Sequence, residues 1–308
     1  GMPVQADDHA DHDTDDADDR GNAQRRVAAI DKEAEQDGHQ DEHDGDDSGG
    51  GVCGGSRNIH SAVSGVSGLE GVGSLLVGIE AAKTLSYIYN KPLVPVHHIR
   101  SHIYANNIEN KMTFPLMALV ISGGHTELLY MKDHFDYEVI GKTLDDAVGE
   151  CYDKVGRVID VPYPGGPVID KLAHIGKPSY KLPVPLCNDS FNFSFSGLKS
   201  AVINLVHNLD QKGEELNKEN LACSFQNVVV ASLTDKTIRA MEKYNVKKLI
   251  LAGGVAANKG IREAFEKLSH EKDFSFSYPS MKYCTDNATM VAAAEKAEGV
   301  AFRSGAAG

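Results

Sequence analysis

The stretch FPLMALVISGGHTELLYM (residues 114–131) contains two apolar runs separated by the pair Gly123-Gly124. Apolar runs of strand length that flank a glycine turn are typical of a β-hairpin. A second apolar run, LILAGG (residues 249–254), also ends in a glycine pair, and Gly253 lies 130 residues after Gly123. The likeness of the two runs suggests repeated structural units, each presenting a glycine-rich turn to a shared cleft.

Around these two runs, expected strands alternate with expected helices, which favours the α/β class. Apolar residues at helical spacing predict helices, and short apolar runs beside turn residues predict strands. Besides the hairpin and the run at 249–252 with the helix that follows it, strands are expected at residues 92–96 and 274–280. Helices are expected at residues 73–90, 144–160, 163–176, 194–209, 218–244 and 286–299.

The charge of the chain is unevenly distributed. The 308 residues have a formal net charge of −13, and residues 1–50 hold 17 Asp and Glu against 4 Lys and Arg. The remaining 258 residues carry 27 charges of each sign, so their balance gives no signal for or against nucleic acid. An acidic segment with few apolar residues cannot offset the entropy of ordering, so we expect residues 1–52 to be a disordered leader.

The compartment is inferred from apolar runs and cysteines. No run of about 18 apolar residues occurs, and the start lacks the cationic and apolar regions of a signal peptide. We therefore expect no membrane span. The cysteines form no CxxC pair, which fits free thiols in a reducing cytoplasm; they are Cys53, Cys151, Cys187, Cys223 and Cys284.

The glycine pairs are candidate ligand-binding turns. A strand that ends in Gly-Gly allows close approach to the backbone, and its N–H groups suit a phosphate. After Gly253, the next helix would add its positive N-terminal end, and Asn258 would hydrogen-bond a sugar, phosphate or adenine. The alternative is a tight turn in which Asn258 caps that helix. The sequence contains neither a P-loop nor a GxGxxG pattern.

His98 and His102 are candidate metal ligands. If the chain turns helical at His98, the two imidazoles lie on one face, one turn apart, as in a chelating pair. Asp286 at the start of the last expected helix is a candidate third ligand. The alternative is a surface or packing pair. Ile99 stands where the HExxH motif of zinc proteases has its Glu.

The segment DDAVGECYDKVGRV (residues 145–158) places several carboxylates together. Asp146 and Glu150 form an i,i+4 acidic pair, which repels unless a cation or hydrogen-bond donor compensates. One interpretation is a solvated helix face balanced by Lys154 and Arg157. The other is a carboxylate that binds ribose hydroxyls or orients a substrate.

Six motifs occur in order and together resemble one family. They are PVHHIRSH, ALVISGGHTELLYM, DDAVGECYDKVGRVIDVPYPGGPVID, FSFSGLKSAVIN, ILAGGVAANKGIRE and CTDNATM. The chain from about residue 71 to about residue 294 closely resembles the tRNA threonylcarbamoyladenosine transferase family of the bacterial TsaD type, formerly named O-sialoglycoprotein endopeptidase.

The resemblance implies a two-lobed actin-like and sugar-kinase-like fold (the ribonuclease-H-like ASKHA class) with a nucleotide cleft. It implies transfer of a threonylcarbamoyl group from threonylcarbamoyl-AMP to the exocyclic amine of an adenosine beside the tRNA anticodon, together with companion subunits. It implies one divalent metal ion, Fe²⁺ or Zn²⁺, held by His98, His102 and Asp286, and no covalent nucleophile. The nucleotide contacts that it implies are Val120, Ile121, Ser122, Gly123, Gly124, Asp153, Gly166, Asp170 and Asn258.

The resemblance also implies a domain division. Residues 1–52 would be the acidic leader, 53–117 a partial first lobe with 286–308 packed back on it, and 118–285 the second lobe. An ETSCDET-like loop and a GGVVPE-ASR-H-like segment, which family members carry ahead of the aligned region, are absent before residue 71. We therefore expect an incomplete first lobe and impaired activity.

Three other functions are compatible with parts of the sequence. An ASKHA-fold phosphotransferase would use an acidic magnesium site, to which the histidine pair is ill suited. A metalloprotease would need a Glu after His98. A non-catalytic subunit of a tRNA-modifying complex would bind partners without transferring the group.

Overall fold

The computed structural model describes residues 72–91, 93–186 and 188–305, and the chain forms two units, residues 1–98 and 99–308. The expected leader, residues 1–52, lies outside the described residues, as do Cys53 and Cys187. Cys151, Cys223 and Cys284 are free thiols, as predicted. In the described ranges no helix has the length and apolar character needed to cross a membrane.

The first unit contains helix α2 (Val72–Ile88), where a helix was predicted. The prediction of a strand at residues 92–96 is wrong for the described residues 93–96, because they pair with no other strand. Pro95 has no N–H group and cannot donate to a ladder, which disfavours a strand here. Val96 is nevertheless buried, whereas Val94 is exposed.

A five-stranded mixed sheet forms the centre of the second unit, in the order β3-β2-β1-β4-β5. The predicted hairpin is confirmed, because β1 and β2 pair antiparallel with Leu119 opposite Leu128. β4 pairs parallel with β1, and β5 pairs parallel with β4. The strands are β1 (Leu116–Ile121), β2 (Thr126–Asp133), β3 (Asp136–Lys142), β4 (Lys248–Ala252) and β5 (Ser275–Ser277).

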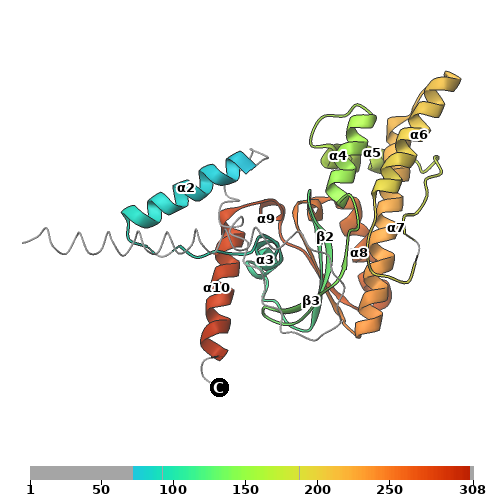
Figure 1. The fold of residues 1–308 in the computed structure, drawn as a ribbon. Helices are drawn as coiled ribbons and strands as arrows, with labels where there is room; N and C mark the ends of the chain where they lie inside the picture. The colour runs from blue at the N-terminus through green and yellow to red at the C-terminus, as the bar shows by residue number, and fades with distance from the viewer. Residues whose placement is uncertain (1–71, 92, 187, 306–308) are drawn as a thin grey trace, which may run out of the picture. The chain divides into compact units, whose positions relative to one another are not determined.

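Helices cover both faces of this sheet (Figure 1), so the predicted α/β class is confirmed. One face carries α4 (Val148–Val158), α5 (Gly165–Ile175), α6 (Ser196–Lys212), α7 (Lys218–Tyr244) and α8 (Lys259–Lys272). The other carries α3 (His98–Tyr104), the 3₁₀ turn η2 (Ala105–Asn107) and α10 (Ala288–Gly305).

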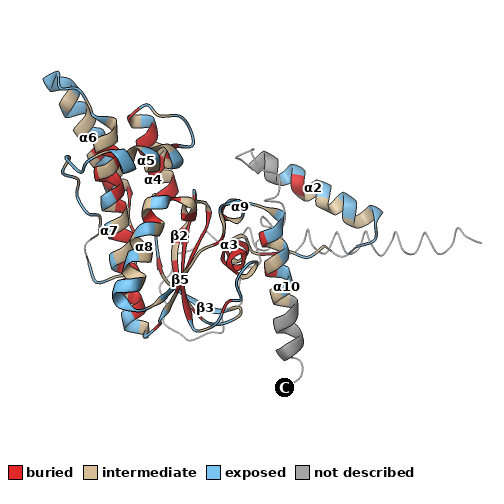
Figure 2. Ribbon diagram, turned by 180° about the vertical axis from the view of Figure 1, so that it is seen from behind, coloured by how far each residue is buried: buried red, intermediate tan, exposed pale blue. Residues whose placement is uncertain are grey.

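The central strand β1 is buried along its whole length because both of its faces are covered (Figure 2). Side chains alternate along a strand, so Met117, Leu119 and Ile121 share one face. They belong to the same core cluster as Val148 of α4 and Val229 of α7. Because β1 and β4 run parallel, their carboxyl ends, and therefore both glycine pairs, lie at one edge of the sheet.

Four elements of the described residues were not predicted: β3, the 3₁₀ turns η2 and η3 (Gly254–Ala257) and the short helix α9 (Met281–Cys284). The side chains of β3 are mostly exposed or half-buried. A strand with few buried positions carries little apolar alternation, which removes the usual sequence signal for a strand.

Candidate functional site

His98 and His102 lie one turn apart on α3, as the four-residue spacing predicts. His102 is only 2% exposed, whereas His98 is half-buried. The boundary between the two units falls directly after His98. Because His98 is the first residue of α3, the helix itself fixes its position relative to His102.

Asp286 meets this histidine pair from the connection between α9 and α10. Its Oδ1 lies 3.0 Å from His102 Nε2, and its side chain is 46% exposed. One ligand atom from each of His98, His102 and Asp286 lies within 4.8 Å of the others. Two imidazole nitrogens and one carboxylate oxygen form a donor set that suits zinc or iron. The structure thus brings together the three residues implied by the resemblance, and they could hold a divalent metal ion.

Aromatic and charged contacts attach α3 to the β2–β3 hairpin. The hydroxyl of Tyr104 hydrogen-bonds His134 Nδ1 at 2.8 Å, and its ring stacks on Phe135. Arg100 Nε donates to the hydroxyl of Tyr137 at 3.2 Å. Burial raises the pKa of Tyr104 far above its usual range, so this hydroxyl stays neutral. These contacts orient the helix that carries both histidines.

The turn after β1 leaves room above its glycines. The Ser122 N–H donates to the His125 carbonyl, and the His125 N–H donates to Ser122 Oγ, which closes the turn. Apart from the chain neighbours, no atom of the described residues would lie within 4 Å of a Cβ at Gly123 or Gly124. Open space beside two glycine backbones fits close approach of a ligand.

Of the five residues implied at this turn, two belong to the strand itself. The side chains of Val120 and Ile121 are completely buried in the core. Ser122 is nearly buried, and only Gly123 and Gly124 are exposed. Any contact with a ligand from this turn therefore has to come chiefly from Ser122, Gly123 and Gly124.

The turn after β4 lies directly beside β1. Gly253 has φ +92°, and a Cβ there would lie 2.3 Å from the Ile121 carbonyl oxygen. Both the positive φ and the close approach require glycine at this position. Packing therefore explains the glycine at position 253, whereas a Cβ at Gly254 would make only one contact, at 4.0 Å from Thr285 Cγ2.

The N-terminus of α8 does not offer the unpaired amides expected for a phosphate. Asp170 accepts hydrogen bonds from the N–H groups of Lys259 and Gly260 at 2.9 and 3.1 Å. Asn258 caps the helix by accepting from the Ile261 N–H at 2.9 Å. Two of the implied nucleotide contacts, Asp170 and Asn258, therefore meet at one helix start, where the capping interpretation of Asn258 is confirmed.

The side chain of Asp153, on α4, reaches the start of α5, where Gly166 lies. Asp153 Oδ1 accepts a hydrogen bond from the Gly165 N–H at 2.8 Å, which caps that helix. Gly166 lies in the first turn, where a Cβ would lie 3.8 Å from the Cβ of Tyr152. Asp153 of α4 thus holds the start of α5, as Asp170 of α5 holds the start of α8.

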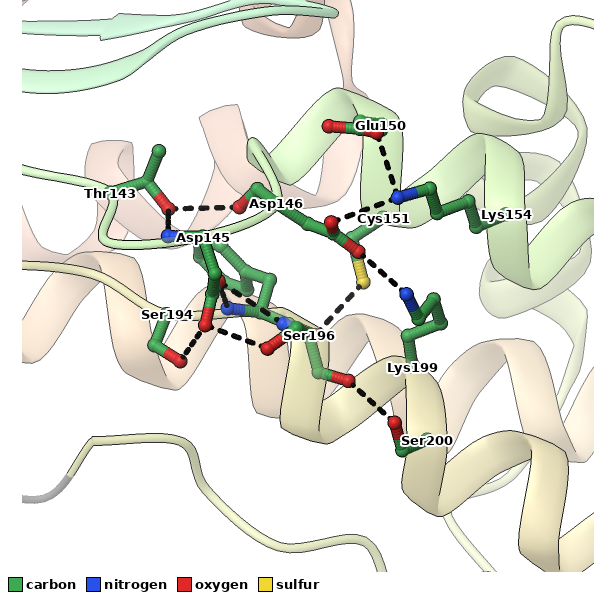
Figure 3. Close-up of polar contacts among 11 residues, drawn as sticks. Thr143, Asp145, Asp146, Glu150, Cys151, Lys154, Ser194, Ser196, Lys199 and Ser200 are labelled. Atoms are coloured by element: carbon green, nitrogen blue, oxygen red, sulfur yellow. Dashed lines mark hydrogen bonds and ion pairs between the residues drawn. The ribbon is translucent and has the colours of Figure 1, made fainter. Parts of the chain in front are cut away.

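The acidic segment before and within α4 is paired internally (Figure 3). Lys154 Nζ lies 2.8 Å from Asp146 Oδ1 and 2.7 Å from Glu150 Oε1, and Lys199 Nζ lies 3.1 Å from Asp146 Oδ2. The prediction that Lys154 balances the acidic pair is therefore confirmed, but Arg157, predicted beside it, forms no ion pair with a described residue. Lys199 adds a second cation from α6 that the sequence interpretation did not include.

Asp145 caps the start of α6 (Figure 3). Its carboxylate accepts from Ser194 Oγ, Ser196 Oγ and the N–H groups of Phe195 and Ser196 at 2.5–3.2 Å. Burial opposes ionisation, but these hydrogen bonds outweigh it and hold the pKa of Asp145 below its usual value. This carboxylate therefore has a structural role between α4 and α6.

Two residues beside the implied nucleotide contacts were not predicted. Tyr152 OH donates to Gln226 Oε1 at 2.7 Å, and Gln226 Nε2 donates to Asp170 Oδ1 at 2.7 Å. The sequence signal for Gln226 is a single amide among apolar residues that recur at helical spacing, such as Ala222 and Val229. A polar group on a buried helix face requires a partner.

A comparison with protein families matches residues 71–293 to the TsaD family, tRNA N6-adenosine threonylcarbamoyltransferase. A curated relative of this name from Staphylococcus carnosus is 62% identical over 224 residues, covering 72% of this chain and 65% of the relative. One from Staphylococcus haemolyticus is 57% identical over 240 residues, covering 78% and 70%. The chain thus spans about two thirds of the length of these relatives.

Among solved structures, HypF of T. kodakarensis is similar, with a TM-score of 0.53 and 15% identity, covering 77% of this chain and 40% of that one. Full-length HypF in a phosphate- and nucleotide-bound form has a TM-score of 0.53 at 14% identity, covering 71% and 37%. At such identity the likeness concerns the fold alone, and it agrees with the predicted fold class.

Proposed function

Because this chain belongs to the TsaD family of tRNA N6-adenosine threonylcarbamoyltransferases, we propose that it transfers a threonylcarbamoyl group to tRNA. The donor is threonylcarbamoyl-AMP, and the acceptor is the exocyclic amine of an adenosine beside the anticodon. The amine nitrogen forms a bond to the carbamoyl carbon and loses one proton to water, the bond from that carbon to the phosphate oxygen breaks, and AMP leaves. Companion subunits of the synthesis complex are the proposed protein partners.

The observation that best supports this proposal is the convergence of His98, His102 and Asp286. Their donor atoms suit one Fe²⁺ or Zn²⁺ ion, which we propose as the cofactor. When bound, such a cation would orient the donor and stabilise negative charge on its oxygens. The lone pairs of His98 and His102 would then be engaged, so neither imidazole would serve as a general base.

The remaining implied residues would hold the adenylate. We propose that the backbone of Gly123 and Gly124 approaches the phosphate or carbamoyl group, since open space lies beside both glycines. Asp170 of α5 and Asn258 would contact the nucleoside part beside the start of α8, and Asp153 of α4 and Gly166 would contribute beside the start of α5. A mixed anhydride already has a good leaving group, so positioning is the main task of these residues.

The wider organisation is also a proposal. Residues 53–117 would form part of a first lobe with residues 286–308, and residues 118–285 would form a second lobe. A cytoplasmic location fits a substrate that is tRNA.

Transfer of labelled threonine tests the function directly. Threonine, bicarbonate and ATP would be supplied with the companion proteins and unmodified tRNA, and label in tRNA would be counted. We expect His102→Ala to reduce incorporation at least about 100-fold, since a metal ligand is lost. The control is His207→Ala, which removes an exposed imidazole of α6 and should leave incorporation unchanged.

Metal content supplies a readout independent of turnover. Wild-type protein and His207→Ala should retain about one equivalent of iron or zinc after dialysis, whereas His102→Ala should retain much less. Equal incorporation by His102→Ala and wild type would contradict the proposed role of the metal.

Binding of tRNA without transfer would favour a non-catalytic subunit. The motifs missing before residue 71 led us to expect reduced activity. Comparing the turnover of this chain with that of the Staphylococcus carnosus relative tests this expectation.

A further inference from the structure

Gln226 connects three helices at the site proposed for the adenylate. It lies on α7 and is 4% exposed. Its side-chain amide hydrogen-bonds Tyr152 of α4, Asp170 of α5 and Asn258 at the start of α8. A buried amide with partners on three other elements can fix their relative positions, because each hydrogen bond is costly to lose away from water.

Hydrogen-bond chemistry determines how this amide is oriented. Asn258 Oδ1 accepts from the Ile261 N–H, so the group that meets it from Gln226 at 3.1 Å has to be the donor Nε2. The same Nε2 donates to Asp170 Oδ1 at 2.7 Å. Gln226 Oε1 then accepts from Tyr152 OH at 2.7 Å. Each of these contacts pairs a donor with an acceptor, and exchanging the two ends of the amide would place its oxygen against the acceptors Asp170 Oδ1 and Asn258 Oδ1.

The packing at the first turn of α8 is adapted to this amide. A Cβ on Gly260 would lie 2.1 Å from Gln226 Nε2 and 3.5 Å from Asp170 Oδ1. Any larger residue at position 260 would therefore push the amide away. Gly260 allows direct contact between the amide of α7 and the helix start.

We propose that Gln226 is a positioning residue that holds Asp170 and Asn258 in place at the start of α8. This inference rests on the proposed function, in which these two side chains contact the adenylate. An amide is required because it donates to the carboxylate of Asp170 while accepting from Tyr152. A carboxylate at 226 would keep the bond from Tyr152 but repel Asp170, and a methionine would provide neither bond.

Amide hydrogen exchange tests the positioning itself, with no ligand needed. In the full chain, Gln226→Glu and Gln226→Met should speed exchange at Lys259, Gly260 and Ile261 by about tenfold or more, since their acceptors become mobile. The control is Asn227→Asp, an exposed change on the same helix that should leave these amides unchanged.

A second route reaches the same contact with Gln226 intact. Gly260→Ala should displace the amide and speed exchange at the neighbouring Lys259 and Ile261 by a similar factor. If Gln226→Glu and Gln226→Met fail to fold, this substitution decides the inference. Unchanged exchange at these amides in the folded variants would overturn it, as would an effect spread evenly over α7.

Binding of AMP to the full chain links the positioning to the proposed site. Calorimetry with AMP should show about tenfold weaker binding for Gln226→Glu and Gln226→Met. Transfer assays should show a raised KM for threonylcarbamoyl-AMP with a nearly unchanged kcat. Faster exchange with unchanged AMP affinity would overturn the link to the adenylate. A wild-type chain that binds no AMP would instead count against the proposed function, while the exchange result would still decide the role of Gln226.

Discussion

Removal of the carboxylate of Asp145 should release the start of α6 from the segment before α4. Four hydrogen bonds converge on this carboxylate, two from serine hydroxyls and two from the N–H groups of Phe195 and Ser196 (Figure 3). Asp145 itself is exposed, so its electrostatic contribution is screened by water. The perturbation is therefore best compared with the loss of an N-cap.

Loss of an N-cap costs about 0.5–2 kcal/mol. Because the hydroxyl contacts are lost as well, we expect Asp145→Ala to lower the free energy of unfolding by about 1.5–2 kcal/mol. Asp145→Asn keeps an acceptor for the amides but loses the charge, so it should cost about 0.5–1 kcal/mol. With an m-value of about 2–3 kcal/mol/M, Asp145→Ala should shift the urea midpoint down by about 0.5–1 M.

The cost should depend on pH in a definite direction. The pKa of Asp145 is lower in the folded chain than its usual value, so its ionised form is favoured by folding. The stabilisation is complete above the unfolded pKa of about 3.9 and is lost as pH falls through the lower, folded pKa. The difference between wild type and Asp145→Asn should therefore be largest at neutral pH and disappear in acid.

Urea denaturation followed by circular dichroism at several pH values would measure this dependence. The control is Asp273→Asn, since the side chain of Asp273 is 99% exposed and lies 3.4 Å from Lys247. That change should alter stability by less than about 0.5 kcal/mol. An Asp145→Ala variant as stable as wild type at neutral pH, or a difference that grows in acid, would refute the capping argument.

Two further substitutions test the packing around the site. Gly253→Ala should lower the free energy of unfolding by about 3 kcal/mol in thermal melts, because its Cβ would overlap a β1 carbonyl oxygen and the residue has a positive φ. Gly213→Ala is the control: it also has a positive φ but lies in open space, so it should cost about 1 kcal/mol. Equal costs for the two variants would rule out the overlap. Lys236→Met should cost about 1–3 kcal/mol, because the buried ammonium donates to the carbonyl oxygens of Leu186 and Ser190. Limited proteolysis should then cut faster between α5 and α6, and an unchanged cleavage rate would argue against this anchoring role.

Local spacing made much of the fold predictable. The hairpin of β1 and β2 follows from two apolar runs around a glycine pair, and α4 follows from apolar residues at helical spacing. The strand expected at residues 92–96 failed because the apolar signal outweighed the missing N–H group of Pro95. β3 was not predicted because its mostly solvent-accessible side chains leave no apolar pattern to detect.

The candidate metal site of His98, His102 and Asp286 shows which part of the site local sequence patterns do not predict. The four-residue spacing of His98 and His102 already places both imidazoles on one helical face. That spacing does not indicate which distant carboxylate joins them; Asp286 was a candidate from its place at the start of the last expected helix, and the family resemblance implied it as a ligand. The 3.0 Å separation of His102 and Asp286 depends on how α3 and the start of α10 pack on the sheet.

The sequence by itself determined the α/β class, most helices, the hairpin, the family and the histidine pair, because these depend on short-range periodicity or on contiguous motifs. Only the tertiary structure decided that Asp170 occupies the amides at the start of α8, and that Gln226 holds Asp170 beside Asn258. These partners lie on separate helices, and a buried polar group binds whichever donor or acceptor the packing places within reach. The hydropathy pattern along the chain does not specify which of these groups lie within hydrogen-bonding distance of one another.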